Sequence, residues 1–160
     1  VLRRNEDVLV TAVPNRFSRE VFDLYRRYQE ERHGRDEPSG ESGFRRFLCD
    51  SAVPTVQMHY RLGETLLGVG WVDELEDGLS SVYFVFDPEA ESRSLGTYSV
   101  IREIEHARQL GMRWHHLGFY VKDSRKMSYK ANFYPHDLLI AGRWERRNNP
   151  KLDRRKNPTQ

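Results

Sequence analysis

At 160 residues the chain is long enough for one domain with a buried core. Its residues are 38% apolar, 31% charged and 12% aromatic, which indicates a folded domain with an aromatic-rich core and excludes a disordered chain. The 26 Lys and Arg residues exceed the 24 Asp and Glu residues by two, so the net charge permits a nucleic-acid partner without arguing for one. No apolar run approaches the roughly 20 residues of a membrane helix.

The single cysteine, Cys49, excludes an internal disulfide and a multi-cysteine metal site within this chain. It follows an apolar stripe, so we interpret it as a small core residue in a protein of a reducing compartment. His115 and His116 are adjacent on a predicted strand and must point to opposite faces, so they do not form a paired metal site. The sequence therefore predicts no metal site.

The N-terminal third should form a strand followed by two helices. Ser18 is a favourable N-cap, and Phe17 and Phe22 are spaced as a hydrophobic staple, so a helix should begin at Ser18. Glycine and polar residues then mark its end and the loop that follows. The expected elements are a strand at 7–14, a helix from Ser18 to Gly34, an exposed loop at 34–43 and a short helix through Phe44, Phe47 and Leu48.

An antiparallel meander of three strands should come next. Apolar and polar residues alternate in the first strand, which is the pattern of a half-buried strand. The second is nearly all apolar and contains Gly68 and Gly70, as expected for a central strand that a neighbour approaches closely. The expected strands are 56–62, 66–72 and 79–86, with turns at 63–64 and 77–78 and a stop at Pro88.

The clearest helix is expected over 94–110, ending at Gly111, with one apolar face toward the core and one polar face toward water. The expected buried stripe is Tyr98, Ile101, Ile104, Ala107 and Leu110, and the expected exposed residues are Arg102, Glu103, Glu105, His106 and Gln109. After it we expect a strand at 114–121, a short helix at 126–133, a hairpin at 138–144 around Ala141 and Gly142, and a charged tail from Arg146. This order predicts an α/β (α+β) fold, a mixed sheet with helices on both faces, as in the Gcn5-related acyltransferases.

Residues 93–98 (RSLGTY) form a strand-to-helix junction, where backbone N–H groups at a helix start can bind an anion. Gly96 would let a ligand approach closely. Acetyltransferases of this fold hold the CoA pyrophosphate with a related motif that ends in Gly or Ala. Here the last position is Tyr98, and its bulk in the place of the phosphates would count against acetyl-CoA. The alternative is that Gly96 only packs the helix on the sheet.

Two further groups of residues are candidates for binding or catalysis. In the Gcn5-related fold the two central strands diverge and the substrates meet in the gap, which Tyr83 with Phe119 or Tyr120 would line; ordinary core packing is the alternative. Lys126 and Lys130 would share one helical face, which favours an anion there, although a solvated face is the commoner explanation. Neighbouring cations are Lys122 and Arg125. Basic residues of the tail that could contact RNA phosphates, or simply be solvated, are Arg146, Arg147, Lys151, Arg154, Arg155 and Lys156.

Four strings carry a family resemblance: DGLSSVYFVFDP (77–88), RSLGTYSVIREIEHARQLG (93–111), HLGFYV (116–121) and KMSYKANFYPHDLL (126–139). They closely resemble the C-terminal domain of the arginyl/leucyl-tRNA–protein transferases, and YRRYQEERHG (25–34) and FRRFLCDS (44–51) are similar to its middle region. The resemblance covers residues 1–147, which we predict to be one domain with 148–160 as a tail. Family members also carry an N-terminal segment with cysteine pairs, which holds an iron–sulfur cluster in some. The chain begins with Val1, so we expect such a segment to be missing.

The resemblance implies transfer of an amino acid, leucine or arginine, from aminoacyl-tRNA to the N-terminal α-amine of proteins that begin with Asp or Glu, marking them for N-degron degradation. It implies a cytoplasmic, monomeric enzyme without metal, CoA or other cofactor, and no membrane partner. Two alternatives are an acetyl-CoA-dependent N-acetyltransferase and a non-catalytic reader of acidic N-termini. On this basis the predicted catalytic residues are Tyr83, Asp87 and Tyr120; the predicted ligands of the tRNA 3′ end are Arg93, Ser94, Gly96, Thr97 and Tyr98; and the predicted ligands of the acidic acceptor are Lys126, Tyr129 and Lys130.

Overall fold

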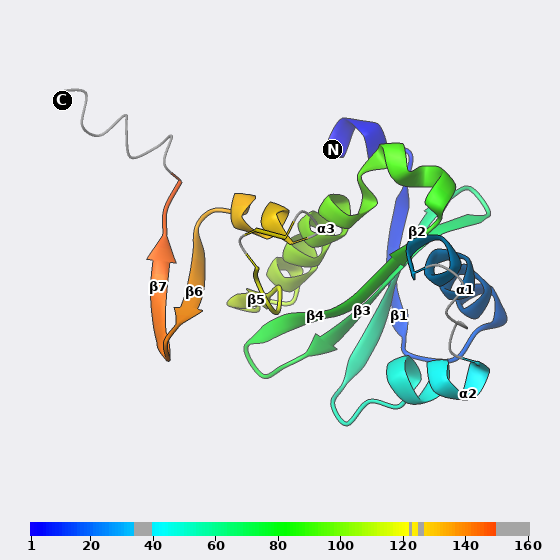
Figure 1. Cartoon of the computed structure of the whole chain (residues 1–160), viewed down its shortest axis with the longest axis horizontal. Coiled ribbons are helices and arrows are strands. Elements are labelled where there is room, and N and C mark those ends of the chain that lie inside the picture. Colours follow the sequence, from blue (N-terminus) through cyan, green and yellow to red (C-terminus); the bar gives the residue numbers. More distant parts are fainter. Residues whose placement is uncertain (34–39, 122, 125–126, 150–160) are drawn as a thin grey trace. The chain divides into compact units, whose positions relative to one another are not determined.

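A five-stranded sheet, in the order β1-β2-β3-β4-β5, occupies the first of two units, Val1–Gly118 (Figure 1). The computed structural model describes residues 1–33, 40–121, 123–124 and 127–149. Strands β1 to β4 pair antiparallel, and β5 pairs parallel to β4, so the sheet is mixed as predicted. The strands are β1 (Leu9–Pro14), β2 (Thr55–Leu62), β3 (Thr65–Glu74), β4 (Gly78–Phe86) and β5 (Trp114–His116).

The predicted meander is confirmed as β2, β3 and β4, each within three residues of its expected bounds. The glycines of β3 and β4 lie where neighbours come close. A Cβ on Gly68 would lie 3.1 Å from a ring carbon of Phe84, and one on Gly78 would lie 2.9 Å from the carbonyl oxygen of Trp114. The second contact is with backbone, so Gly78 is what allows β4 and β5 to pair side by side.

The helix α1 (Arg19–His33) begins as its sequence predicts. The N–H of Val21 donates to Ser18 Oγ at 3.5 Å, and the rings of Phe17 and Phe22 are 6.0 Å apart, which confirms the cap and the staple. The predicted stop, Gly34, and the loop residues 34–39 lie outside the described residues. The end of the predicted loop is helical, because α2 (Glu41–Phe44) already begins at Glu41 and continues as a π-helical turn, η2 (Arg45–Cys49).

Helices cover both faces of the sheet, as predicted: α1 and α2 lie on one face and α3 (Leu95–Gln109) on the other (Figure 1). Each face has its own buried cluster, so the sheet separates two cores. The α3 side is built from Val8, Met58, Tyr60, Leu67, Val72, Leu79, Ala90, Leu95, Tyr98 and Ala107. The other side is built from Val21, Phe22, Leu24, Tyr25, Phe44, Leu48, Leu66, Val69, Trp71 and Val85.

The buried face of α3 differs from the predicted one. Tyr98 and Ala107 are buried, whereas Leu110 is 48% exposed and Glu103, which we expected to face water, is only 1% exposed. The side chains at positions 95, 99, 103 and 107 are all buried and are spaced four residues apart, so they form one row along the helix. Glu103 fits in this row because Gly70 on β3 has no side chain: a Cβ there would lie 3.4 Å from Glu103 Oε1.

Strand β5 is shorter than predicted. It ends at His116, and residues 117–121 form no strand because Gly118 adopts a left-handed conformation (φ 70°) that turns the chain out of an extended path. A 3-10 helix that the sequence did not predict, η3 (Pro88–Arg93), links β4 to α3. In the part of the chain that the structure describes, no helix is long and apolar enough to cross a membrane.

The second unit, Phe119–Gln160, contains a 3-10 helix, η4 (Ser128–Asn132), and a hairpin of β6 (His136–Ile140) and β7 (Arg143–Arg147). The helix is shorter than predicted and of the 3-10 type. The hairpin is confirmed: Ala141 and Gly142 both have positive φ, 48° and 79°, as a two-residue type I′ turn requires. Arg146 and Arg147, expected in a loose tail, lie in β7, while 150–160 are outside the described residues.

Candidate functional site

Strand β5, at the edge of the sheet, pairs with β4 over a short length only. Gly78–Ser80 of β4 pairs with Trp114–His116 of β5, and β4 then continues to Phe86 without a further strand beside it on that edge among the described residues of the first unit. The register between β3 and β4 also shifts here, because Trp71 faces Tyr83 while Val72 faces Ser81. Val82 is thus the extra residue of a β-bulge, a feature that re-aims side chains. β5 itself ends at His116, and Phe119 and Tyr120 lie in no strand, so the expected divergence of two strands is not seen in the first unit.

Tyr83, a predicted catalytic residue, follows the bulge and is half-buried. Its ring lies beside those of Tyr25, Phe47 and Trp71, on the α1 face of the sheet. Gln29 Nε2 donates to the phenol oxygen at 3.0 Å, and burial raises the pKa of Tyr83 above its usual value. The phenol therefore keeps its proton at neutral pH and is suited to donating a hydrogen bond rather than to acting as a base.

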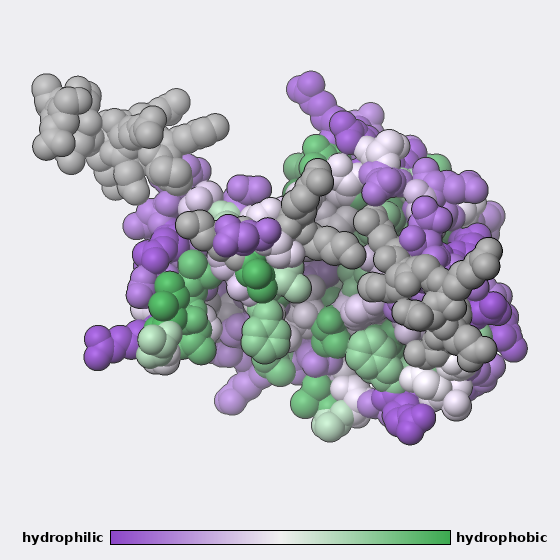
Figure 2. Space-filling view, viewed as in Figure 1, coloured by the Kyte–Doolittle hydropathy of each residue, from purple (hydrophilic) through white to green (hydrophobic). Residues whose placement is uncertain are grey.

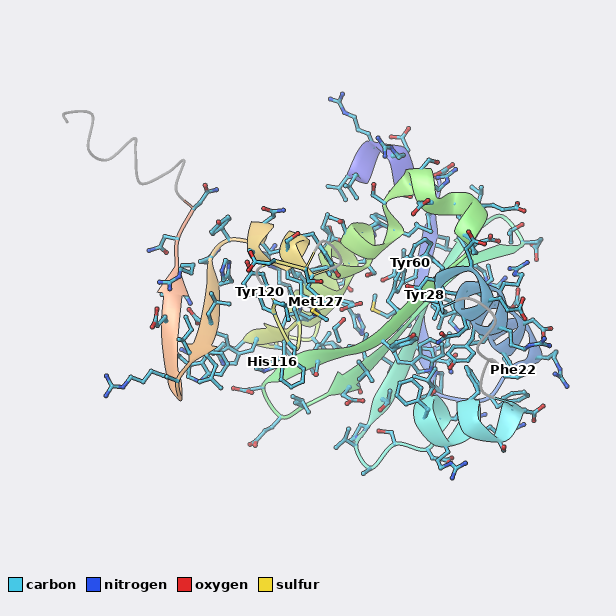
Figure 3. The ribbon with its side chains drawn as sticks, in the orientation of Figure 1. Phe22, Tyr28, Tyr60, His116, Tyr120 and Met127 are labelled. Carbon is cyan, nitrogen blue, oxygen red and sulfur yellow. The ribbon has the colours of Figure 1, made fainter. Side chains whose placement is uncertain are left out.

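Asp87 and Tyr120, the other predicted catalytic residues, lie in different units. Asp87 caps η3 by accepting from the N–H of Glu89 at 3.1 Å, and its other oxygen lies 3.3 Å from Arg27 Nη2. Both carboxylate oxygens thus have structural partners. Tyr120 is half-buried in the second unit, in the irregular segment after Gly118 (Figure 3). Their catalytic roles stay predictions.

The junction before α3 is more occupied than the sequence suggested. Arg93 binds Asp7 through two hydrogen bonds of 2.8 and 3.0 Å and donates to the carbonyl of Arg4 at 2.9 Å. A phosphate at Arg93 would therefore compete with Asp7. Ser94 adopts a left-handed conformation (φ 57°), and its carbonyl accepts from the N–H groups of Thr97 and Tyr98, both at 3.1 Å.

The backbone of this turn still offers an anion site. The first N–H groups of an α-helix have no acceptor within the helix, and here they belong to Leu95 and Gly96. A Cβ on Gly96 would meet nothing within 4 Å, so close packing of the helix on the sheet does not explain this glycine. Open space for a ligand remains the reading that the geometry favours.

Tyr98 is a core residue, and this corrects two inferences from the sequence. Its side chain is 1% exposed; its hydroxyl donates to the carbonyl of Asn5 at 3.2 Å and accepts from Arg102 Nε at 3.0 Å. The side chain packs against Tyr60, which lies between the sheet and α3 (Figure 3). It is therefore not available to a tRNA, and its bulk does not stand where phosphates would bind, so it gives no argument against CoA.

The ion pair between Asp7 and Arg93 should make stability depend on pH in the acid range. The hydrogen bonds from Arg93 lower the pKa of Asp7 in the folded protein, relative to about 3.9 in an unfolded chain. The contribution of the ion pair to the free energy of unfolding is therefore complete above the unfolded pKa of Asp7. It is lost as pH falls through the lower pKa of Asp7 in the folded protein. We expect Asp7→Asn to lower the melting temperature at pH 7 and to leave it unchanged at a pH below the folded pKa. Thermal unfolding at both pH values tests this, and Asp23→Asn on the exposed face of α1 is the control. An equal fall in the melting temperature of Asp7→Asn at the two pH values would contradict the prediction.

The predicted acceptor-binding residues belong to the second unit. Tyr129 and Phe133 share a face as predicted, with ring centroids 6.4 Å apart. Lys130 Nζ donates to the carbonyl of Phe119 at 2.9 Å, and burial lowers the pKa of this lysine. This hydrogen bond holds the ammonium group in place within the unit. Lys126 lies outside the described residues.

A buried polar cluster that the sequence did not predict lies where β4 and β5 pair. Glu103 Oε2 accepts from Ser81 Oγ at 2.6 Å and is 2.8 Å from His115 Nε2, while Oε1 has no partner in the described part of the chain. The side chains of Glu103 and His115 are 1% and 8% exposed. The sequence does contain a signal for the burial of Glu103. It lies four residues from both Ser99 and Ala107, which places it in the buried row of α3. The described residues hold no group of three His, Cys, Asp or Glu side chains suited to a metal ion.

The family model described as "Arginine-tRNA-protein transferase, C terminus" matches residues 20–140. The chain belongs to this family. The resemblance seen in the four sequence strings is thereby confirmed.

Curated relatives of this transferase-family chain are named aspartate/glutamate leucyltransferase. The protein from Acinetobacter baumannii (strain AYE) is 38% identical over 149 residues, which cover 91% of this chain and 55% of that protein. The protein from Marinobacter nauticus is 41% identical over 146 residues, covering 90% and 62%. The chain thus spans little more than half the length of the curated relatives it matches.

A solved structure confirms the fold class. The IAA acetyltransferase from Bacillus cereus ATCC 14579 matches 87% of this chain and 93% of its own, with a TM-score of 0.54. At 13% identity this likeness concerns the fold alone. The chain therefore has the mixed-sheet architecture that the order of elements predicted.

Proposed function

We propose that this protein transfers leucine from leucyl-tRNA to the N-terminal α-amine of proteins that begin with Asp or Glu. The observation that carries the proposal is the 38–41% identity, over about nine-tenths of the chain, to relatives named aspartate/glutamate leucyltransferase. The family model alone would leave arginine as the donor. The names of the relatives favour leucine.

The proposed reaction is aminolysis of an ester. The acceptor's α-amine attacks the carbonyl carbon of the leucyl ester, a C–N bond forms, and the C–O bond to the tRNA 3′ adenosine breaks. The amine's proton ends on the departing ribose oxygen. An α-amine has a pKa of about 7.7–8.0, so a useful fraction is neutral and no strong base is needed. The protein's main contributions are then proximity and stabilisation of the oxyanion.

The described residues offer parts for these tasks. The protonated phenol of Tyr83, on β4 just past the bulge, is suited to donating a hydrogen bond to an oxyanion. The N–H groups of Leu95 and Gly96 at the start of α3, with open space beside Gly96, suit a phosphate of the tRNA 3′ end. Asp87, the other predicted catalytic residue of the first unit, is held by Arg27 and by the N–H of Glu89, so the arrangement supports a structural role more directly than a catalytic one.

The proposal includes several points about the whole protein. We infer a monomeric, cytoplasmic enzyme that marks its products for N-degron degradation and that needs neither metal nor CoA for the chemical step. Gel filtration tests the oligomeric state. Retention of transfer after dialysis against a chelator tests the need for a metal.

The direct test incubates the purified protein with leucyl-tRNA or arginyl-tRNA and peptides that begin with Asp, Glu or Asn. Mass spectrometry should find one added leucyl residue on the Asp and Glu peptides only. Addition of arginine instead would replace the donor in the proposal. Acetylation of the peptide from acetyl-CoA would support an acetyltransferase, and binding of the Asp peptide without any modification would support a non-catalytic reader.

Lys130 should contribute to recognition of the acidic acceptor. A carboxylate in a substrate cleft needs a cationic partner, and the Lys130 ammonium is held at a fixed place by Phe119. We expect Lys130→Met to remove most of the preference for Asp over Asn peptides, about 1.5–3 kcal/mol in the ratio of kcat/KM values. Lys130→Arg should keep much of it, and Lys126→Met tests the second predicted lysine. Full discrimination in both Met variants would show that the carboxylate is bound elsewhere.

A further inference from the structure

We propose that a cavity beside α2 in the first unit binds the aminoacyl group of the donor, with its apolar side chain against the walls and its α-ammonium group on two carboxylates. The inference rests on the proposed function. The cavity has a volume of about 290 Å³, and its lining residues come from η2, the segment that follows it, the start of β2, and β3 and β4. Ligand cavities begin at about 300 Å³, so this one suits a single amino-acid group rather than a peptide.

The walls of the cavity are apolar side chains left exposed. Phe47 is 57% exposed, Val53 40% and Val82 43%. Figure 2 shows apolar surface beside α2. Val82 is the extra residue of the bulge between β3 and β4, so the bulge and the cavity share a residue. An aliphatic side chain placed here would remove these groups from water.

Two carboxylates line the same cavity without a cation. Asp73 Oδ1 accepts from Thr55 Oγ1 at 2.6 Å, which fixes the carboxylate in place. Within the described ranges, no Lys, Arg or His side chain forms an ion pair with Asp73 or with Asp50. A ligand that brings a positive charge would form ion pairs with these two carboxylates.

Trp71 provides an independent observation. Its side chain lines the cavity and is 1% exposed, yet its indole N–H has no acceptor among the described residues. Buried donors in folded proteins nearly always have a partner, so the unpaired indole N–H of this lining residue is a donor that a bound ligand could satisfy. The carbonyl oxygen of an aminoacyl group is such an acceptor.

The charge decides which substrate occupies the cavity. An acceptor that begins with Asp or Glu would bring a carboxylate against Asp50 and Asp73, which is unfavourable. A leucyl group on tRNA brings an aliphatic side chain, an α-ammonium group and a carbonyl oxygen, and each has a counterpart among the lining residues. An arginyl group also carries an α-ammonium group, so the binding experiment below compares the amides of leucine and arginine.

Binding can be tested without catalysis. Leucinamide carries the side chain, the α-ammonium group and a carbonyl, whereas N-acetylleucinamide keeps the side chain and the carbonyl but has a neutral, acetylated nitrogen. We expect leucinamide to shift the indole N–H resonance of Trp71, assigned with Trp71→Phe, and N-acetylleucinamide to shift it only at about tenfold higher concentration or more. A shift by argininamide at lower concentration than leucinamide would overturn the assignment to leucine, and no shift with any of the three would overturn the site.

Kinetics separates the two substrates. Asp73→Asn keeps the acceptor for Thr55 and removes the charge, and Asp50→Asn removes the charge of the other lining carboxylate. Each should raise the KM for leucyl-tRNA about tenfold and leave the KM for the Asp peptide unchanged. Glu74→Gln, one residue along β3 and absent from the lining residues, is the matched control and should change neither.

The outcomes distinguish this inference from the proposed function. Normal transfer with an unchanged KM for leucyl-tRNA in both Asp variants overturns the inference alone, as does a rise only in the KM for the peptide. Absence of transfer from any donor overturns the proposed function, and the resonance of Trp71 then still decides whether the cavity binds an α-ammonium group.

Discussion

Glu103→Ala should lower the free energy of unfolding by about 3–5 kcal/mol, because a buried network loses its common acceptor. Glu103 Oε2 accepts from Ser81 and is within hydrogen-bond distance of His115, and the carboxylate is 1% exposed. Without it the hydroxyl and the imidazole remain buried without that partner, and a cavity opens under Gly70. The network joins α3 to β4 through Ser81 and to β5 through His115, so the loss should also weaken the pairing of β4 with β5.

Urea unfolding of the variant measures this loss. Glu105→Ala is the control, since Glu105 lies two residues along the same helix in a half-exposed ion pair with Arg102 and should cost at most about 1 kcal/mol. Should Glu103→Ala fail to fold, Glu103→Gln retains one acceptor and is expected to lose about 1–3 kcal/mol. Equal effects at positions 103 and 105 would contradict the role assigned to the network.

Phe44→Ala should be about as damaging, with an expected loss of 3–5 kcal/mol. Phe44 is fully buried, and its ring lies 5.0–6.0 Å from those of Phe17, Phe22, Tyr25 and Trp71. The four-residue α2 is too short to be stable by itself, so this side chain is what fixes it on the sheet.

The next aromatic residue gives a matched comparison. Phe47→Ala removes a side chain that is 57% exposed and should cost less than about 1 kcal/mol. Because η2 follows α2 directly and carries part of the cavity wall, Phe44→Ala should also weaken leucinamide binding in the folded fraction. A stability loss at Phe47 equal to that at Phe44 would show that packing of α2 does not depend on the buried ring.

Local signals predicted most of the fold. The existence of β2, the cap at Ser18 and the turn at Ala141 and Gly142 each depend on residues a few positions apart, and each is confirmed. The alternation within β2 is broken at Gln57, which is buried beside Met58. Glu103 was misplaced because the burial of a carboxylate depends on Ser81 and His115, which lie 22 and 12 residues away in the chain. Periodicity alone assigns a glutamate to water.

The candidate site was less predictable for the same reason. Tyr98 was interpreted as a ligand-facing residue because it ends a motif, whereas its partners Asn5 and Tyr60 lie far away in sequence and place it in the core. The cavity was not predicted at all, since its lining comes from η2, β2, β3, β4 and the segment between η2 and β2. Residue types in such a set form no motif, and only the folded arrangement brings them together.

Substitution of Gly78 and of Gly96 should have opposite effects on cellular abundance. A mutational library scored separately for abundance and for transfer would show this. Position 78 should accept no side chain in either score, because any Cβ would lie 2.9 Å from the backbone of Trp114. At position 96, in the first turn of α3, alanine meets no atom within 4 Å and should raise abundance, since it favours a helix over glycine by about 0.5–1 kcal/mol. If the tRNA 3′ end approaches this turn, the same alanine should nonetheless reduce transfer. Full transfer with alanine at position 96 would show that the donor does not approach there, and the preference for glycine would then need an explanation outside the reaction.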